Sequence, residues 1–455
     1  MYNKKISISL VASFLLATNS LSNELYISSA TKSEQSIKDV TSNVEVITKE
    51  DIEERNFTTV VEALNSLPGV ITNTLGGIGQ QTSVYLRGFD ANKTLVLLDG
   101  IKYNDSTSSS GSPMLQHLII SNIERIEVVK GAQSGIWGPD SSAGVINIIT
   151  KKPNKGISGS LNIEAGSNIS RKLAANIAYS DEKVDLSLSA SKLKTKGISV
   201  YSTNGEDIDK FEKDGYENKT LFLKSAYKLN DNSKIGLEHN IILAEIEGDE
   251  LNNPDSKYDS KVEEKFSKFY LENRNDNLKL YTYMNFSEFN REYPDALSGN
   301  EFDGNVVDTG FNLQYNYSKK SFLIGGVSYT KYRTIKEDKD DYNNKAVFLT
   351  NSTSLNDDST IFTSSIRYDK SDKFFSETTG KIGLKQNIFE DLYISSNIGK
   401  GFNIPTIYQL FTPEIISTYG TFKVGKEDLE TEEVTSYDVT IGYKTLKATY
   451  FYNKI

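Results

Sequence analysis

Several residue types that usually carry metal, redox or nucleophilic chemistry are absent or scarce in this sequence. It has no cysteine, two histidines and one tryptophan among 455 residues. A chain without cysteine has no disulfide framework, iron–sulfur cluster or thiolate zinc site, and His117 and His239 are too few for a histidine-rich metal centre. We recognise no nucleophile–base arrangement and no metal-ligand motif. The sequence therefore predicts a protein that is not an enzyme, and any bound metal would have oxygen ligands.

Long apolar runs and an excess of positive charge are also missing. The longest mainly apolar stretch covers Ile6 to Ala17, which is well short of the roughly 20 residues that a membrane-spanning helix needs. This length excludes a helical membrane protein. The 51 basic side chains are outnumbered by 61 acidic ones, which gives a net charge of −10. We therefore expect no binding to nucleic acid through its phosphates.

The first 22 residues have the pattern of a Sec signal peptide. Lys4 and Lys5 precede the apolar run, and Ser20 and Ser22 are the small residues expected before a cleavage site. An N-terminal amphipathic helix is the alternative, but the run is apolar on all sides rather than striped. We therefore expect export to the periplasm, to the outside, or to a membrane that the chain crosses as a closed β-barrel.

Residues 32–152 combine short helical patterns, apolar strands and many glycines, which predicts a small α/β domain. One helix should begin after Thr48, an N-cap with Asp51 at the third helical position, and the helical pattern should stop at Pro68. Four glycines are interpreted as turn residues with positive φ rather than as ligand contacts: Gly131, Gly135, Gly138 and Gly144.

From Gly156 onward the pattern changes to strands that alternate at every second residue. Leu186 and Leu188, for example, share one face, while Ser187 and Ser189 share the other. Such half-polar strands fit either a soluble antiparallel sheet or a transmembrane barrel. The 26 tyrosines and 21 phenylalanines favour the barrel, because aromatic rings gather where membrane and water meet. The absence of a linker after Pro153 also favours one barrel over several smaller soluble units.

Several motifs in the first half resemble those of the TonB-dependent receptors of the Gram-negative outer membrane. They are VEVITKEDI at 44–52, LPGV at 67–70, YLRG at 85–88, LVLLDGIKY at 95–103 and IERIEVVKGAQSGIWGPDSSAGVINIITK at 123–151. The resemblance implies an α/β plug domain inside an antiparallel transmembrane β-barrel in the outer membrane, and a monomer. It divides the chain into a signal peptide (1–22), a TonB box and N-terminal tail (23–31), a plug (32–153) and a partial barrel (154–455).

The same resemblance implies import of a small-molecule ligand, powered by a TonB-type energy transducer. The vitamin B12 receptors are the most similar type. On them the TonB box corresponds to Glu24, Leu25, Tyr26, Ile27, Ser28, Ser29, Ala30 and Thr31. This segment has no proline, so its main chain can add as a strand to a partner's sheet. A disordered tail is the alternative, and a signal-transducing receptor fits less well because only nine residues separate the signal peptide from the plug.

Two plug loops resemble the cobalamin-contacting loops of the vitamin B12 receptors. The candidate ligand-binding residues are Gln81, Ser83 and Asp90 in the first loop and Ser108 and Ser109 in the second. They could hydrogen-bond the amides around a corrin ring, although serine-rich loops are also common flexible connections. A ferric siderophore is the rival ligand, but these loops lack the clustered arginine and aromatic residues that it favours. Heme would favour an axial histidine.

Two acidic clusters lie in segments expected to be extracellular loops. Their candidate calcium ligands are Asp207, Asp209, Asp214 and Asp249, because carboxylates on adjacent loops can supply the oxygen ligands that Ca²⁺ requires. A solvated acidic face is the alternative interpretation. No other cofactor is expected.

A set of charged residues lies among the apolar strands of the plug: Arg87, Asp99, Glu124, Arg125, Glu127 and Lys130. Buried charges are costly unless they are paired. One interpretation makes these residues a weakly held polar interface between plug and barrel wall. The other makes them ordinary salt bridges that fix the fold of the plug.

The predicted barrel is shorter than the resemblance implies. At about 21 residues for each strand with its connection, the sequence after the plug makes about 14 strands, whereas a barrel of this family has about 22. The segment 401–411 (GFNIPTIYQLF) resembles a region that precedes further hairpins, and Ile455 is not the terminal aromatic residue expected in this family. We therefore interpret the sequence as that of a C-terminally truncated receptor, with a non-functional form as one alternative.

Overall fold

The structure is a computed structural model. It describes residues 24–200, 207, 210–249, 259–293, 301–334, 341–373, 376–389, 391–412, 415–417, 420–422 and 425–455. The predicted signal peptide, Asn23 of the predicted tail and the candidate calcium ligand Asp209 lie outside these residues.

The first half of the chain forms a small domain around a five-stranded sheet. Its strand order is β3 (Asn43–Ile47), β8 (Ile123–Lys130), β9 (Gly144–Thr150), β6 (Thr94–Leu98) and β7 (Ile101–Lys102). Every residue of β6 and β9 is buried, which agrees with their continuous apolar sequence. Only β6 and β9 run parallel. The domain is therefore built of α and β elements, as the mixed sequence pattern predicts.

Two-stranded sheets and short helices complete this domain. Strands β1 (Tyr26–Ile27) and β2 (Gln35–Ser36) pair, as do β4 (Val70–Thr74) and β5 (Thr82–Leu86). The α-helices are α1 (Lys49–Arg55), α2 (Val60–Asn65) and α3 (Ser134–Trp137), and the 3-10 helices are η1 (Ile37–Asp39), η2 (Ala91–Lys93), η3 (Leu115–His117) and η4 (Ile120–Asn122). Thr48 caps α1 in a capping box with Asp51, which confirms the predicted helix start.

The second half of the chain forms one antiparallel sheet of 15 strands in sequence order, compared with the predicted 14. Its strands are β10 (Gly156–Gly166), β11 (Ser170–Ser180), β12 (Val184–Ile198), β13 (Asp214–Asn230), β14 (Ser233–Ile246), β15 (Ser260–Arg274), β16 (Leu278–Glu292), β17 (Glu301–Asn316), β18 (Phe322–Thr334), β19 (Tyr342–Leu355), β20 (Thr360–Ser371), β21 (Ser376–Phe389), β22 (Leu392–Asn403), β25 (Glu432–Tyr443) and β26 (Leu446–Lys454). Helix α4 (Ile407–Phe411) and the hairpin of β23 (Ile415–Ser417) and β24 (Gly420–Phe422) lie between β22 and β25.

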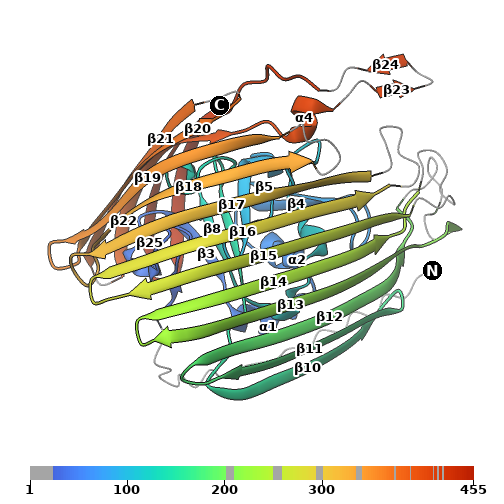
Figure 1. Ribbon diagram of the computed structural model, residues 1–455, viewed down its shortest axis with the longest axis horizontal. Helices are drawn as coiled ribbons and strands as arrows, with labels where there is room; N and C mark the ends of the chain where they lie inside the picture. The colour runs from blue at the N-terminus through green and yellow to red at the C-terminus, as the bar shows by residue number, and fades with distance from the viewer. Residues whose placement is uncertain are drawn as a thin grey trace, which may run out of the picture.

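The large sheet curves around the small domain, which lies inside the curve as a plug (Figure 1). Turns of two to five residues join the strands at one end of this wall, on the left in Figure 1, and the other end carries all of the longer connections between strands. The predicted arrangement of an α/β plug enclosed by antiparallel strands is thus confirmed. Among the described residues, no helix is both long and apolar enough to cross a lipid bilayer.

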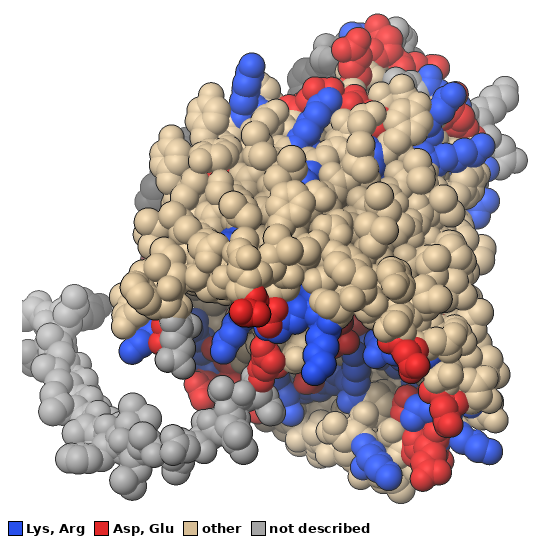
Figure 2. Space-filling view, turned by 90° about the vertical axis from the view of Figure 1, so that its left-hand side faces the viewer, with Lys and Arg blue, Asp and Glu red and all other residues tan. Residues whose placement is uncertain are grey.

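The wall has its apolar face on the outside and its polar face on the inside, which is the opposite of a water-soluble sheet. Leu186 and Leu188 are 44% and 43% exposed on the outer face, whereas Ser187 and Ser189 are buried on the inner face. Many large apolar side chains are exposed along the other strands as well. Figure 2 shows a broad surface with few charged side chains, and acidic and basic residues gathered around a hollow below it. The apolar outer face suits lipid, and the polar inner face suits the plug.

Three of the four predicted turn glycines, Gly131, Gly138 and Gly144, have positive φ angles of 89°, 89° and 156°. The prediction for Gly135 is wrong, because this residue lies inside α3 without a positive φ. A Cβ atom there would lie 2.9 Å from the Cα of Gly380 on β21. Gly135 is therefore needed for the close approach of the plug helix to the wall.

Candidate functional site

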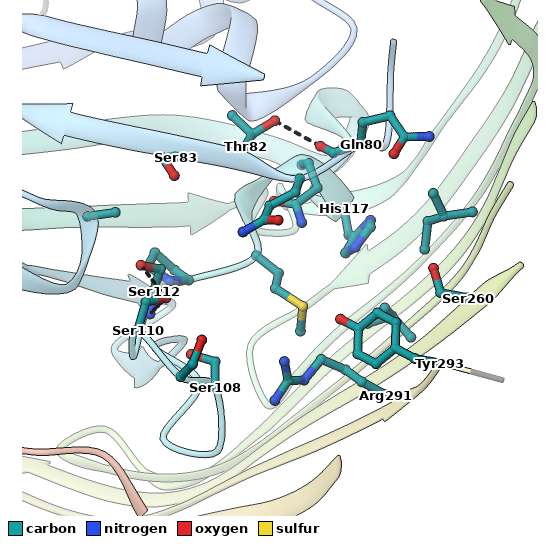
Figure 3. A pocket seen from close by; sticks show the side chains of 18 of the residues that line it. Gln80, Thr82, Ser83, Ser108, Ser110, Ser112, His117, Ser260, Arg291 and Tyr293 are labelled. Atoms are coloured by element: carbon teal, nitrogen blue, oxygen red, sulfur yellow. Dashed lines mark hydrogen bonds between the residues drawn. The ribbon is translucent and has the colours of Figure 1, made fainter. Parts of the chain in front are cut away.

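A pocket of about 860 Å³ lies between the plug loops and the end of the wall that carries the long connections. All five candidate ligand-binding residues line it: Gln81, Ser83, Asp90, Ser108 and Ser109. Figure 3 shows Ser83 and Ser108 on one side of the pocket and Arg291 and Tyr293 of the wall on the other. The fold thus brings the two predicted loops to one cavity, while their contact with a ligand stays a prediction.

The second plug loop is held in a compact turn and anchored to the wall. The Asp105 carboxylate accepts hydrogen bonds from the backbone N–H and hydroxyl of Thr107, at 2.8 and 2.6 Å. Its other oxygen lies 3.0 Å from Nε of Arg291, and the Arg291 guanidinium also donates to the Thr107 hydroxyl at 3.1 Å. The Gln409 side chain donates to the carbonyl of Ser109. These contacts hold the loop that carries Ser108 and Ser109 in place at the pocket.

The pocket has further lining residues that were not predicted from the sequence: Arg291 on β16, Tyr293 directly after it, Phe302 on β17 and Tyr408 on helix α4. The alternation along β16 does give a signal for Arg291. Arg291 is an even number of residues from Asn285, so both side chains lie on the polar face of this strand. The inward direction of that side, and the meeting of Arg291 with Asp105, depend on the tertiary structure.

The charge of the pocket is acidic. Its lining includes Asp90, Glu247 and Asp249, with Arg291 as the only arginine or lysine among the described residues that line it. Because Arg291 is paired with the buried Asp105, its positive charge is already neutralised. His117 adds no charge near neutral pH, since burial lowers its pKa to about 3. An anionic ligand would therefore meet unfavourable electrostatics here.

His117 lies in the pocket wall but is only 2% exposed. Its Nδ1 shares a 3.0 Å hydrogen bond with the Tyr216 hydroxyl, and its ring stacks on that of Tyr216. An axial heme ligand needs an accessible ring nitrogen. The packing of His117 therefore suits a structural role better than heme ligation.

The predicted TonB box, residues 24–31, is folded back into the plug. Tyr26 and Ile27 pair with Ser36 and Gln35 of the same chain, and the side chain of Ile27 is fully buried. One oxygen of the Glu127 carboxylate accepts the backbone N–H groups of Ser28 and Ser29, at 3.1 and 3.0 Å. This segment is ordered, so the alternative of a disordered tail is wrong for it. Its main chain must leave these partners before it can pair with another protein.

Two further plug side chains surround this segment. The Trp137 indole N–H donates to the carbonyl of Ser29 at 2.7 Å. The ammonium group of Lys32 lies 4.8 Å from the centre of the Trp137 ring and 4.4 Å from that of Phe348 on β19. It faces an internal cavity of about 130 Å³. Burial, and repulsion from Arg367 in second place, lower the pKa of Lys32 to about 7.

Comparison with known proteins identifies the group to which these features belong. A family model described as "TonB-dependent Receptor Plug Domain" matches residues 36–145, and a model described as "TonB dependent receptor-like, beta-barrel" matches residues 159–455. The chain belongs to the TonB-dependent receptor family. The members of this family are outer-membrane β-barrel proteins.

Two curated relatives of this receptor carry the same name. The chain is 27% identical to "Vitamin B12 transporter BtuB" of Photobacterium profundum, over 94% of this chain and 68% of that protein. It is also 27% identical to the protein of that name from Vibrio vulnificus, over 88% of this chain and 66% of that protein. The chain thus spans about two thirds of the length of these relatives.

Solved structures agree on the fold. A mutant of the ferric enterobactin receptor PfeA of Pseudomonas aeruginosa matches with a TM-score of 0.76 and 16% identity, over 90% of this chain and 70% of that one. The siderophore receptor PirA of Acinetobacter baumannii matches with a TM-score of 0.73 and 17% identity, over 90% and 70% of the two chains. At these identities the likeness shows a shared fold.

The charged residues of this receptor's plug divide between the two predicted roles. Arg87 contacts Asp438 of the wall at 3.5 Å, and Asp99 contacts Lys224 of the wall at 2.8 Å. Within the plug, Arg125 pairs with Glu127 and Lys130 pairs with Glu45. Contacts of both kinds are therefore present, each made by different residues, and the predicted weakness of the interface between plug and wall stays a prediction. Glu124, which is partly buried on the plug strand β8, belongs to neither set of pairs within the described part of the chain.

The candidate calcium ligands are not assembled into a site by the described residues. Asp207 is exposed, the Asp214 carboxylate accepts the backbone N–H of Val200, and Asp249 lies at the ligand pocket. Among the described residues, no group of three or more His, Cys, Asp or Glu side chains is placed to hold a metal ion. Because Asp209 lies outside these residues, calcium binding by the acidic loops stays a prediction.

Lys32 gives the receptor's tail a predicted pH dependence. The docked tail prefers neutral Lys32, whereas a released, solvated lysine titrates near 10.5. The released tail therefore binds more protons between these values, so lowering the pH from about 10.5 to 7 should favour release. A spin label on Tyr26→Cys should become more mobile over this range.

The Lys32→Met variant serves as the control for this pH dependence. It keeps the length and apolar stem of the side chain and removes the titrating group. We expect the label to be less mobile than in the native tail at pH 7 and to lose most of its pH response. An unchanged pH response in this variant would assign the effect to another group.

Proposed function

We propose that this receptor takes part in the TonB-dependent import of a bulky, scarce nutrient, and that this nutrient is cobalamin. The observation that carries the proposal is the acidic pocket at the long-connection end of the wall, which has room for a large ligand and no unpaired arginine or lysine among its described lining. The two curated relatives described above carry the name of vitamin B12 transporters. This name supports cobalamin as the ligand.

The energy-coupling part of the proposal rests on the opposite end of the molecule. The tail lies near the short turns, where Lys320, between β17 and β18, contacts Asp39 just beyond the tail at 3.3 Å. The long-connection end is the extracellular end in outer-membrane barrels, and the short turns are periplasmic. A ligand would thus bind outside while a TonB-type energy transducer takes hold of the segment 24–31 from the periplasm.

A ferric siderophore is the second candidate, and a specific observation favours it. The pocket lining includes Arg291, Tyr293, Phe302 and Tyr408, and these are residue types suited to anionic aromatic ligands. However, the pairing of Arg291 with Asp105 removes the free positive charge that such a ligand would need. The pocket therefore supports cobalamin better.

Binding measurements on the purified chain distinguish the two ligands. We expect cyanocobalamin to bind at least about tenfold more tightly than ferric enterobactin, because the neutral corrin does not meet the repulsion from the acidic lining. The Asp90→Asn and Glu247→Gln double variant should narrow this difference by improving siderophore binding. Tighter binding of the siderophore to the unmodified chain would overturn the choice of cobalamin.

A further inference from the structure

The outer face of the wall changes from apolar to basic along strand β12. Its outward residues are Leu186, Leu188 and Ala190, followed towards the long-connection end by Lys192, Lys194 and Lys196. All six are exposed. Because the outward apolar residues of a barrel strand face lipid, the first lysine marks the level at which the apolar surface ends.

The neighbouring strands extend this basic surface to both sides. Lys192 is opposite Lys219 of β13, and Lys194 is opposite both Glu217 of β13 and Arg171 of β11. We call the five basic residues the rim patch: Arg171, Lys192, Lys194, Lys196 and Lys219. With Glu217 the group carries a formal charge of +4, five basic residues less one acidic one, in a chain whose net charge is −10.

A single carboxylate holds three of these lysines together. Glu217 lies 2.8 Å from the ammonium groups of Lys192, Lys194 and Lys219. Each ammonium has three donors, so donors remain after this contact, and the three lysine side chains stay about half exposed or more, at 50%, 66% and 49%. Arg171 and Lys196 form no ion pair with any described residue. The rim patch thus keeps uncompensated positive charge close together.

The next strands differ at the corresponding level. On β14 to β16 the outward charged residues are Glu245, Lys261, Glu263, Lys265, Glu288 and Glu292. Lys261 pairs with Glu292, and Lys265 pairs with Glu263 and lies 3.1 Å from Glu288. With four acidic and two basic residues, that group carries a formal charge of −2. The excess of positive charge on strands β11 to β13 therefore ends at β14 and does not continue onto β15 and β16.

We propose that the rim patch is a binding site for a lipid with a phosphate-bearing headgroup in the outer leaflet of the membrane. Its basic side chains complement the phosphates, and the apolar face directly below, which includes Leu173, Leu188 and Leu221, receives the acyl chains. The basic surface is continuous with the apolar surface, so a lipid can contact both. A free anion would contact only the basic part, and the surface therefore favours a lipid. This site is separate from the ligand pocket, which lies inside the wall.

The test compares lipids that differ only in phosphate. The purified full chain in nonionic detergent is titrated with a bis-phosphorylated acylated disaccharide lipid and with its dephosphorylated form, and bound lipid is counted by native mass spectrometry. We expect binding of the phosphorylated form only. The triple variant Lys192→Gln, Lys194→Gln and Lys196→Gln should weaken it on the order of 100-fold. Arginine at the same three positions should preserve it.

A matched control uses three exposed lysines in the short turns at the opposite end of the wall: Lys183→Gln, Lys319→Gln and Lys444→Gln. This variant removes the same charge and should keep the native affinity. The proposal is overturned if both triple variants weaken binding equally, if the dephosphorylated lipid binds as well, or if millimolar inorganic phosphate displaces the lipid. Equal binding of an oligoglutamate peptide would also overturn it and assign the patch to an acidic protein.

Discussion

Replacing Glu127 by alanine is expected to release the N-terminal tail of the receptor from the plug. The Glu127 carboxylate is the acceptor for two consecutive backbone N–H groups, those of Ser28 and Ser29. Hydrogen bonds to a charged group contribute about 1.5–3 kcal/mol each. Their loss should shift the balance between docked and released tail by about 3 kcal/mol, or roughly 100-fold.

The absence of cysteine makes this change easy to measure. A spin label attached to a single cysteine in place of Tyr26, which is 46% exposed, should be immobile in the parent and mobile in the Glu127→Ala variant. Glu45→Ala is the matched control, because Glu45 lies on the adjacent strand β3 and pairs with lysines instead of the tail. An immobile label in the Glu127 variant would show that the pairing of β1 with β2 is sufficient to hold the tail.

This release bears directly on the proposed transport. A transducer that pulls on the segment 24–31 must first overcome the contacts that dock this segment on the plug. Removing the Glu127 hydrogen bonds should therefore expose the tail even without ligand. Glu127→Ala should therefore bind the energy transducer in the absence of ligand, whereas the parent should need ligand first. Co-purification with the periplasmic part of the transducer checks this expectation.

The second large effect is expected at the contact between Arg87 and Asp438. Both side chains are 4% exposed, and they lie 3.5 Å apart across the boundary of plug and wall. The guanidinium also lies over the ring of Phe451 at 4.7 Å. Arg87→Met keeps most of the volume but leaves a buried carboxylate without its partner, which should cost about 3–5 kcal/mol of unfolding free energy.

Urea unfolding followed by the fluorescence of Trp137 measures this loss, since Trp137 is the one tryptophan of the sequence and lies in the plug. Adding Asp438→Asn to the Arg87→Met chain should restore much of the stability, because the buried charge is then gone. Lys49→Met is the comparison, as its pair with Glu53 is exposed on both sides, and it should change stability by less than about 1 kcal/mol. Equal losses at Arg87 and Lys49 would contradict the importance of burial.

Local sequence patterns were sufficient for most of the secondary structure. The capping box at Thr48 depends on residues three positions apart, and the alternation along β12 depends on neighbours in the same strand. Both are local, so the sequence predicts them. Gly135 is different. A glycine is needed there because the backbone of Gly380, which is distant in sequence, lies too close for a side chain. The positive φ predicted for Gly135 is wrong because no turn requires it.

The candidate site shows the same division. Loop similarity placed Gln81, Ser83, Asp90, Ser108 and Ser109 together, and the structure puts all five at one pocket. No local pattern predicts that Arg291 meets Asp105 and is neutralised by it, because that pairing joins residues far apart along the chain. The electrostatic character of the pocket, on which the choice of ligand depends, follows from this pairing.

By itself, the sequence determined that the chain has an α/β plug followed by half-polar strands, because periodicity and capping act between residues close along the chain. Only the tertiary structure decided that the polar faces of those strands turn inward onto the plug, that the tail is docked by Glu127, and that the basic rim patch lies directly above an apolar surface. These features depend on which side of each strand meets which partner, and burial of apolar area and pairing of charge settle that choice only when the whole chain is folded.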